Sequence, residues 1–258
     1  NNLQTMLQMY LEEHMKGKIR GAEFIVAVPT DITDVEKRAF FEMFYKSKLK
    51  PKSVLLCEKP IADAVGLGLD VNEPTGIMVV DIGADTTEIS VISLGGLVLS
   101  DLLHFGGNRI DESIITYVKR TYNLVIGQKT AQALKEKLGS GIPGNTETMV
   151  IVGRDVVSGL PIEMEITGEV VYEAIKDNLN SICNSIKMIL EKTPPELAAD
   201  VADRGIVLTG GGALLRGLEE LIEDRTGINT MTADDPMTCV AIGTGKYVEF
   251  LSGKRDDD

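Results

Sequence analysis

An apolar segment that ends in an acidic residue and leads into a tight polar turn constrains this chain more than any other feature. Ile77–Val91 reads Ile-Met-Val-Val-Asp-Ile-Gly-Ala-Asp-Thr-Thr-Glu-Ile-Ser-Val, which predicts a buried strand over 77–81, a turn, and a returning strand over 88–93. Backbone N–H groups and hydroxyls in such a turn can face an anion. The pattern therefore predicts a turn that holds a phosphate tail, with a metal beside it.

A second glycine-rich turn follows another apolar strand. Ile206–Leu215 reads Ile-Val-Leu-Thr-Gly-Gly-Gly-Ala-Leu-Leu, which predicts a strand over 206–208 and a helix over 213–225. Glycines before a helix N-terminus let a ligand approach the backbone closely. Either turn alone is common in proteins, whereas both together in this order are much stronger evidence for a binding site.

The composition limits the classes of partner. The 258 residues, 43% of them hydrophobic, can bury one large or two modest cores. A net charge of −13, no tryptophan and 5% aromatic residues argue against a nucleic-acid partner. Cys57, Cys183 and Cys239 have no metal-binding spacing, which indicates buried thiols in a reducing cytoplasm.

Neither a membrane span nor a signal peptide is expected, because no apolar run approaches the roughly 20 residues that a spanning helix needs. The chain does not start with methionine, and it opens inside helical periodicity. We therefore expect a fragment whose N-terminal portion is absent.

Hairpins and parallel crossovers both occur in the expected element order, which predicts an α/β fold. A solvated tail is expected over 254–258. Strands are expected at 24–28, 53–57, 77–81, 88–93, 97–102 and 206–208, with a hairpin over 148–166. Helices are expected at 3–16, 34–48, 60–67, 130–138, 169–192, 213–225 and 238–251, with one more starting near Ile110.

The two turns, in this order, resemble the second phosphate loop and the adenosine loop of the actin, chaperone and sugar-kinase superfamily. Further motifs resemble the MreB/Mbl family of bacterial actins, and the resemblance covers essentially the whole chain. These motifs are Val-Ala-Val-Pro-Thr-Asp-Ile-Thr-Asp-Val-Glu-Lys-Arg (26–38), Gly-Gly-Asn-Arg-Ile-Asp-Glu (106–112), Glu-Lys-Thr-Pro-Pro-Glu-Leu-Ala (191–198) and Asp-Asp-Pro-Met-Thr-Cys-Val-Ala (234–241).

The resemblance implies an actin-like (ribonuclease H-like) two-lobed fold, with mixed sheets flanked by helices and a cleft for ATP or ADP with Mg²⁺. Members of this family associate with themselves into filaments in the cytoplasm, at the inner face of the cell membrane. There they guide the cell-wall elongation machinery and determine cell shape. No nucleic-acid partner is implied.

The resemblance also implies a division into lobes. Residues 1–75 would be the remainder of an incomplete first lobe that lacks the first phosphate loop, and residues 76–258 would form the second lobe. The C-terminal helix over 238–251 either stays with the second lobe or returns to the first.

Site residues carry over from the family position by position. Asp81 would lie near Mg²⁺, contact it through water and help to position the attacking water, although a strand-end aspartate can also simply cap a turn. We expect Gly83 to permit a positive φ. The candidate nucleotide contacts are Gly83, Asp85, Thr86, Thr87, Gly106, Gly107, Asn108, Ala133, Leu134, Lys135, Glu136, Gly210, Gly211, Gly212, Ala213, Leu214 and Leu215.

Two segments depart from the family. The family loop reads Asp-Ile-Gly-Gly-Gly-Thr-Thr-Glu, so Ala84 and Asp85 replace two glycines, and Asp85 places a carboxylate where a phosphate tail is expected. The family helix reads Glu-Glu-Pro-Met-Ala-Ala-Ala-Ile-Gly, and Lys59 replaces the glutamate that polarises the hydrolytic water. An ammonium group has no acceptor and cannot be that base. We therefore hypothesise impaired ATP hydrolysis, and a Lys59–Asp85 ion pair across the hydrolytic centre; the alternative is that the two positions changed independently and Lys59 turns to solvent.

Two other classes share the superfamily's cleft. A sugar or acetate kinase needs a general base beside a polar substrate pocket, and no dedicated candidate is visible in the sequence. A chaperone ATPase domain needs a linker and a substrate-binding domain after its last helix, whereas this chain ends in an acidic tail at Asp258.

Overall fold

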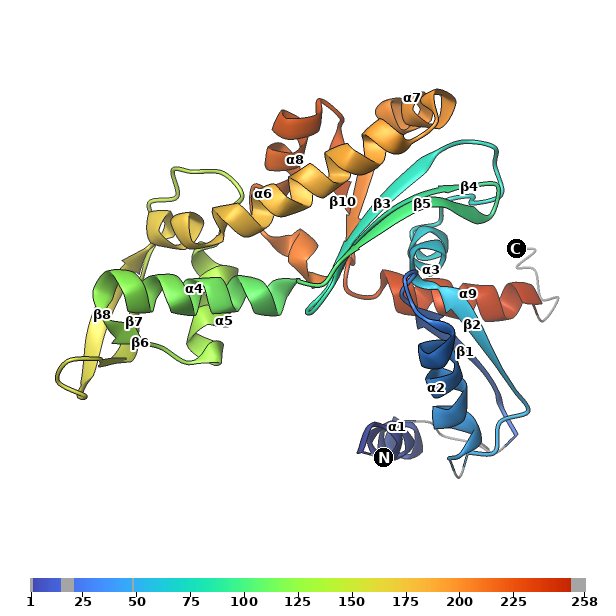
Figure 1. Ribbon diagram of the computed structural model, residues 1–258, viewed down its shortest axis with the longest axis horizontal. Coiled ribbons are helices and arrows are strands. Elements are labelled where there is room, and N and C mark those ends of the chain that lie inside the picture. Colours follow the sequence, from blue (N-terminus) through green and yellow to red (C-terminus); the bar gives the residue numbers. More distant parts are fainter. Residues whose placement is uncertain (1, 15–20, 48, 252–258) are drawn as a thin grey trace.

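The computed structural model describes residues 2–14, 21–47 and 49–251. A five-stranded mixed sheet of order β10-β9-β3-β4-β5 lies at the centre of the fold (Figure 1). The β3–β9 and β9–β10 pairs are parallel, whereas β3–β4 and β4–β5 are antiparallel. The strands are β3 (Ile77–Ile82), β4 (Thr87–Ser93), β5 (Gly96–Leu103), β9 (Ile206–Thr209) and β10 (Thr230–Thr232).

The central strand β3 is buried on both faces, because its side chains alternate between two cores. Met78, Val80 and Ile82 enter the largest hydrophobic cluster, whereas Ile77 and Val79 enter a smaller cluster on the opposite face. This alternation places the next odd-numbered residue, Asp81, on the face of the smaller cluster.

The largest core continues from the sheet into an arm formed by helices and a small antiparallel sheet of order β6-β7-β8 (left side of Figure 1). The long helix α6 contacts β4, β5 and α4, and so connects this arm to the central sheet. The elements are α4 (Gly107–Tyr122), β6 (Leu124–Val125), α5 (Gln128–Leu138), β7 (Thr148–Asp155), β8 (Pro161–Thr167) and α6 (Gly168–Lys192).

A second group of elements lies on the other side of the molecule (right side of Figure 1). It contains a parallel pair of strands and the helices around them. The group comprises α1 (Asn2–His14), β1 (Glu23–Val28), α2 (Asp34–Tyr45), β2 (Ser53–Glu58), α3 (Lys59–Gly66) and α9 (Cys239–Leu251).

Helix α9 packs closely on α3 because small residues line the contact. A Cβ atom on Gly243 would lie 1.6 Å from the carbonyl oxygen of Ala62, and one on Gly66 would lie 2.1 Å from that of Cys239. Helix α9 also contacts β1. We propose that the boundary between the lobes lies near residue 75 and that α9 belongs with the first lobe.

Most expected elements are present, with differences at boundaries. Thr33 caps α2, accepting a hydrogen bond from the Glu36 backbone N–H. The expected helix over 213–225 is divided into the short helix η1 (Gly211–Leu214) and α8 (Leu218–Thr226), because Gly217 between them has a left-handed φ of 69°. The expectations for residues 15–16, 48 and 254–258 lie outside the described residues.

Three elements were not expected from the sequence. Helix α7 (Pro195–Arg204) starts at the second of two consecutive prolines, directly after the helix expected over 169–192. Proline suits the first turn of a helix as well as the end of one. The other two elements are β6 and β10, which contain two and three residues and are too short to show periodicity.

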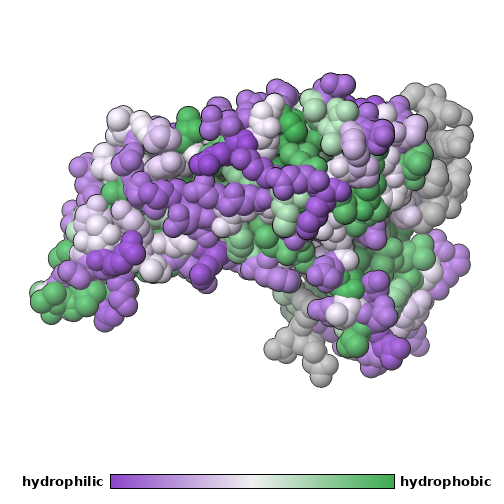
Figure 2. Space-filling view, turned by 45° about the horizontal axis from the view of Figure 1, so that its top comes forward, coloured by the Kyte–Doolittle hydropathy of each residue, from purple (hydrophilic) through white to green (hydrophobic). Residues whose placement is uncertain are grey.

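The tip of the β7–β8 hairpin is apolar and exposed. Val157 is 85% exposed, Leu160 63% and Val156 50%. Figure 2 shows hydrophobic colouring at this end of the arm. Among the described residues, no helix is long and apolar enough to cross a membrane.

Candidate functional site

The two glycine-rich turns meet at one edge of the central sheet. Strands β3 and β9 are parallel neighbours, with Asp81 paired to Thr209, so the turns that follow them lie side by side. A cavity of about 820 Å³ opens there, which is within the usual range for small-molecule sites. Its lining is Lys59, Asp81, Gly83, Ala84, Gly107, Asn108, Ile110, Asp111, Gln132, Lys135, Glu136, Gly210, Gly211, Gly212, Leu214, Leu215, Arg216, Pro236, Met237 and Val240.

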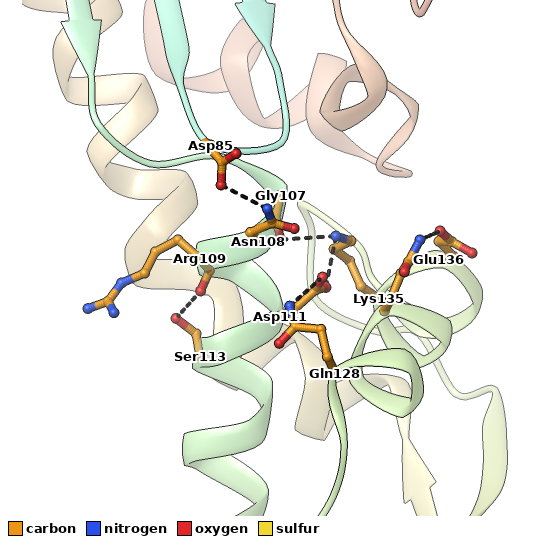
Figure 3. Close-up of polar contacts among 10 residues, drawn as sticks. Asp85, Gly107, Asn108, Arg109, Asp111, Ser113, Gln128, Lys135 and Glu136 are labelled. Carbon is orange, nitrogen blue, oxygen red and sulfur yellow. Dashed lines mark hydrogen bonds and ion pairs between the residues drawn. The ribbon is translucent and has the colours of Figure 1, made fainter. Parts of the chain in front are cut away.

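The turn after β3 is held against the N-terminus of α4. The backbone N–H of Gly107 donates to the carbonyl of Gly83 at 2.9 Å, and the backbone N–H of Asn108 donates to that of Ala84 at 2.8 Å. A Cβ on Gly106 would lie 2.3 Å from the Gly83 carbonyl oxygen, so this approach requires glycine. The Asn108 side-chain amide donates to Asp85 at 2.8 Å (Figure 3).

The glycines after β9 have different roles. Gly210 has a φ of 78°, and a Cβ there would lie 2.4 Å from Asp81 Oδ1. A Cβ on Gly212 would lie 2.2 Å from Ile82 Cγ2, whereas one on Gly211 would meet only Met237, with its sulfur 3.7 Å away. The sequence predicts that these glycines let a ligand approach the backbone, but Gly210 and Gly212 are constrained first by their contacts with β3.

The opposite wall of the cavity is held by an ion pair between two helices. Lys135 on α5 lies with its Nζ 2.8 Å from Asp111 Oδ1 on α4, and it donates to the carbonyl oxygen of Gly107 at 3.0 Å (Figure 3). The Lys135 side chain is 18% exposed and that of Asp111 is 3% exposed. Glu136 accepts a hydrogen bond from Gln132 at 2.8 Å.

Several acidic side chains lie close together beside the end of β3. The strand register places Glu88 of β4 and Thr209 of β9 on either side of Asp81, and all three are buried. Asp63 of α3, which is fully buried, faces the same group. Glu88 accepts hydrogen bonds from the backbone N–H and the hydroxyl of Thr30, which connects the segment after β1 to the central sheet.

One cation, Lys59, enters this acidic group. Its Nζ lies 2.5 Å from Asp81 Oδ2, and the Lys59 and Asp81 side chains are 21% and 5% exposed. The hypothesised Lys59–Asp85 pair is therefore wrong. Asp85 lies at the exposed tip of the turn, where Asn108 binds it, whereas Lys59 begins α3 beside the end of β3.

Burial raises the pKa of the Asp63 carboxyl group to about 8, with the neighbouring Asp81 charge as the second cause. The Lys59 ammonium opposes this shift without cancelling it. Burial also raises the pKa of Glu88, although its two bonds from Thr30 counteract part of the effect. Asp63 is therefore neutral at pH 7, and the charge on Asp81 is balanced by Lys59.

An Asp63→Asn variant should be more stable than the wild type at pH 8. The pKa of Asp63 is about 8 when folded and near 3.8 when unfolded, so between these values the folded state retains a proton that the unfolded state has released. Wild-type stability therefore falls as pH rises through this window, whereas asparagine does not titrate. We expect equal stability near pH 4 and an advantage of at least about 2 kcal/mol for the variant at pH 8. Urea unfolding at both pH values measures this, and a difference that does not change with pH would contradict it.

Several candidate residues do not line the cavity. Thr87 is fully buried, and its hydroxyl donates to the carbonyl oxygen of Phe105 at 3.0 Å, so that side chain does not face a ligand. Leu134 and Ala213 belong to the hydrophobic core. Gly83 does not adopt a positive φ. Asp85, Thr86, Gly106 and Ala133 also lie outside the lining.

The structure also adds cavity residues that were not expected. Asp111 stands in the family-like segment 106–112, and its spacing from Gly107 on a helix was a usable signal. The other additions to the lining are Ala84, Ile110, Gln132, Arg216, Pro236, Met237 and Val240. Asp63 does not line the cavity but lies beside Asp81, and it stands where the family helix has alanine, a departure that was visible in the sequence.

Two glycine-rich turns at adjacent parallel strands, with helices from both sides of the molecule around one cavity, define a protein with an actin-like fold. The solved structures confirm this class: MreB5 of Spiroplasma citri bound to AMPPNP superposes with a TM-score of 0.92 at 32% identity, covering 97% of this chain and 75% of that one. The MamK double helical filament superposes with a TM-score of 0.80 over 95% of this chain and 74% of that one; at 24% identity, it shows the fold alone.

The chain belongs to the MreB/Mbl family, whose model, described as MreB/Mbl protein, matches residues 1–255. The cell shape-determining protein MreB of Escherichia coli (strain K12) is 43% identical over 251 residues, which are 96% of this chain and 72% of that protein. The cell shape-determining protein Mbl of Bacillus subtilis (strain 168) is 41% identical over 250 residues, which are 96% of this chain and 74% of that protein.

Proposed function

We propose that the cavity binds ATP or ADP. The observation that carries this proposal is the meeting of the turn after β3 and the Gly210–Gly212 turn around one space of about 820 Å³. Phosphates would lie against Gly83 and the start of α4, and the adenosine would lie between Lys135 and the second turn. The S. citri MreB5 structures, with AMPPNP and with ADP, support the nucleotide class.

The nucleotide would control assembly rather than serve metabolism. We infer that the protein associates with itself into filaments in the cytoplasm, peripheral to the inner face of the membrane, and guides the cell-wall elongation machinery. Family membership and relatives named as cell shape-determining proteins support this role. The match over residues 1–255 favours neither a small-molecule kinase nor a chaperone ATPase domain.

Hydrolysis of the bound nucleotide is proposed to be slow. In this family the residue before Pro60 is expected to accept a proton from the attacking water, and here that residue is Lys59. Its ammonium group has donors only. The Lys59 Nζ also lies 2.5 Å from Asp81 Oδ2, so it is paired with the carboxylate that was expected to position the water.

Sedimentation of the full-length protein tests the proposed assembly. We expect more protein in the pellet with AMPPNP than without nucleotide. The apolar tip of the β7–β8 hairpin is a candidate contact with a second copy, because Val157 is 85% exposed there. Val157→Glu should raise the concentration needed for assembly by about tenfold, since a charge would enter an apolar contact.

The matched control for this experiment is Val35→Glu, because Val35 is 78% exposed on α2 and lies away from the hairpin. It should assemble like the wild type. A wild-type protein that stays in the supernatant with and without AMPPNP would refute the filament proposal. Equal assembly of Val157→Glu and wild type would refute only the role of the hairpin tip.

A further inference from the structure

Lys59 points into the part of the cavity where the terminal phosphates of a nucleotide would lie. Its Nζ is 2.5 Å from Asp81 Oδ2 and 3.9 Å from the point where a Cβ on Gly83 would sit. Both Lys59 and Asp81 line the cavity. An ammonium group has three donors, so the bond to Asp81 leaves two for other acceptors.

The position of Lys59 on its helix is unusual in electrostatic terms. It is the first residue of α3, where the helix dipole disfavours a cation, and the first turn of α3 contains no acidic residue. The Glu58 side chain provides no capping bond either. The stabilising partner of the ammonium group is therefore Asp81, across the base of the cavity.

The residues around Asp81 do not fit a divalent metal ion. Mg²⁺ in nucleotide sites is held by one or two carboxylates together with the phosphates, at about 2.0–2.1 Å. Here Oδ2 of Asp81 contacts Lys59, and Oδ1 lies only 2.4 Å from the point where a Cβ on Gly210 would sit. A metal ion at this carboxylate would meet the Lys59 ammonium, and like charges repel.

The neighbouring carboxylates do not supply a replacement ligand set. Glu88 is bound by Thr30, Asp63 is fully buried, and Asp85 is bound by Asn108. Over residues 2–14, 21–47 and 49–251, no group of three or more His, Cys, Asp or Glu side chains could hold a metal ion. Among the described residues, no set of carboxylates could hold the Mg²⁺ directly, and the Asp81 carboxylate that was expected to contact it through water is paired with Lys59.

We propose that the Lys59 ammonium takes the place of the divalent cation, so that this protein binds nucleotide triphosphate tails without Mg²⁺. Asp81 holds the ammonium in position, and the two remaining donors of Lys59 neutralise and bind oxygens of the terminal phosphate. This inference rests on the proposed nucleotide binding, and it concerns how the same site recognises the phosphate charge.

Calorimetric titration of the full-length protein with AMPPNP tests the inference, once in excess Mg²⁺ and once in excess EDTA. For the wild type, the two dissociation constants should agree within about threefold. Lys59→Gln removes the charge and frees Asp81, so its affinity should fall by about tenfold or more on removal of Mg²⁺, corresponding to the loss of one charge contact. Lys59→Arg retains the charge and should remain insensitive to EDTA.

Lys135→Gln is the matched control, because Lys135 is also a half-buried, ion-paired lysine in the same cavity. It should weaken AMPPNP binding in both conditions by the same factor. Wild-type binding that weakens tenfold or more in EDTA would overturn the inference and leave the proposed nucleotide binding intact. Insensitivity of Lys59→Gln to EDTA would also overturn it. No binding in either condition would overturn both proposals.

Discussion

Replacing Lys59 by glutamate and Asp63 by alanine in one variant should raise the rate of phosphate release from ATP by about a hundredfold. A positioned general base contributes roughly 10²–10⁴-fold to such a step. The glutamate would stand at the start of α3, where Lys59 now reaches Asp81, and could accept the proton of the attacking water. The alanine is the family residue at this position, and it removes a buried carboxyl group whose proton the new carboxylate could otherwise share.

The measurement is steady-state phosphate release in excess Mg²⁺, with protein concentration and assembly state matched. Lys52→Glu is the control for charge reversal: Lys52 pairs with Glu23 at 2.8 Å, is 72% exposed and does not line the cavity. Its rate should equal that of the wild type. If the wild type already releases phosphate as fast as the double variant, Lys59 does not impair hydrolysis.

Much of the fold could be predicted from local sequence signals. The run Ile77–Ile82 is apolar at five of six positions, which marks it as a strand buried on both faces. The segment 148–167 alternates across a glycine-containing turn and forms the expected β7–β8 hairpin. The helix that ends before Pro194 was also expected, because proline cannot continue it.

The contacts inside the site could not be predicted in the same way. The sequence alone does not show whether Lys59 contacts Asp81 or Asp85, because both aspartates follow α3 at similar intervals along the chain. The strand register decides it: Asp81 is at the buried end of β3, next to Glu88 and Thr209, whereas Asp85 lies beyond that end. Long-range packing therefore determines which aspartate pairs with Lys59, and the local sequence pattern contains no information about that packing.

The roles of the three glycines after β9 could not be predicted from the sequence either. Three consecutive glycines after β9 suggested one common role, namely access for a ligand. In the structure all three glycines line the cavity, but a Cβ on Gly210 or Gly212 would collide with β3, whereas one on Gly211 would meet only the Met237 side chain. That difference depends on where β3 lies relative to the turn, which a single sequence does not specify.

Gly211→Leu should abolish nucleotide binding and leave the fold intact. A Cβ at this position meets only the Met237 side chain at ordinary contact distance, so the protein can accept it. The leucine would then occupy cavity volume between the two turns, and overlap with a bound ligand costs several kcal/mol unless the ligand moves. We expect affinity for AMPPNP to fall at least about a hundredfold, with no more than a small change in melting temperature.

Gly127→Leu is the matched control, because Gly127 is exposed, lies outside the cavity and has no atom within 4 Å of its Cβ position. It should bind AMPPNP like the wild type.

Calorimetric titration of AMPPNP into the wild type, Gly211→Leu and Gly127→Leu tests most directly whether this cavity is the nucleotide site. The expected result is saturable binding to the wild type and Gly127→Leu, and none to a folded Gly211→Leu protein. Equal binding to all three proteins, or to none of them, would contradict it.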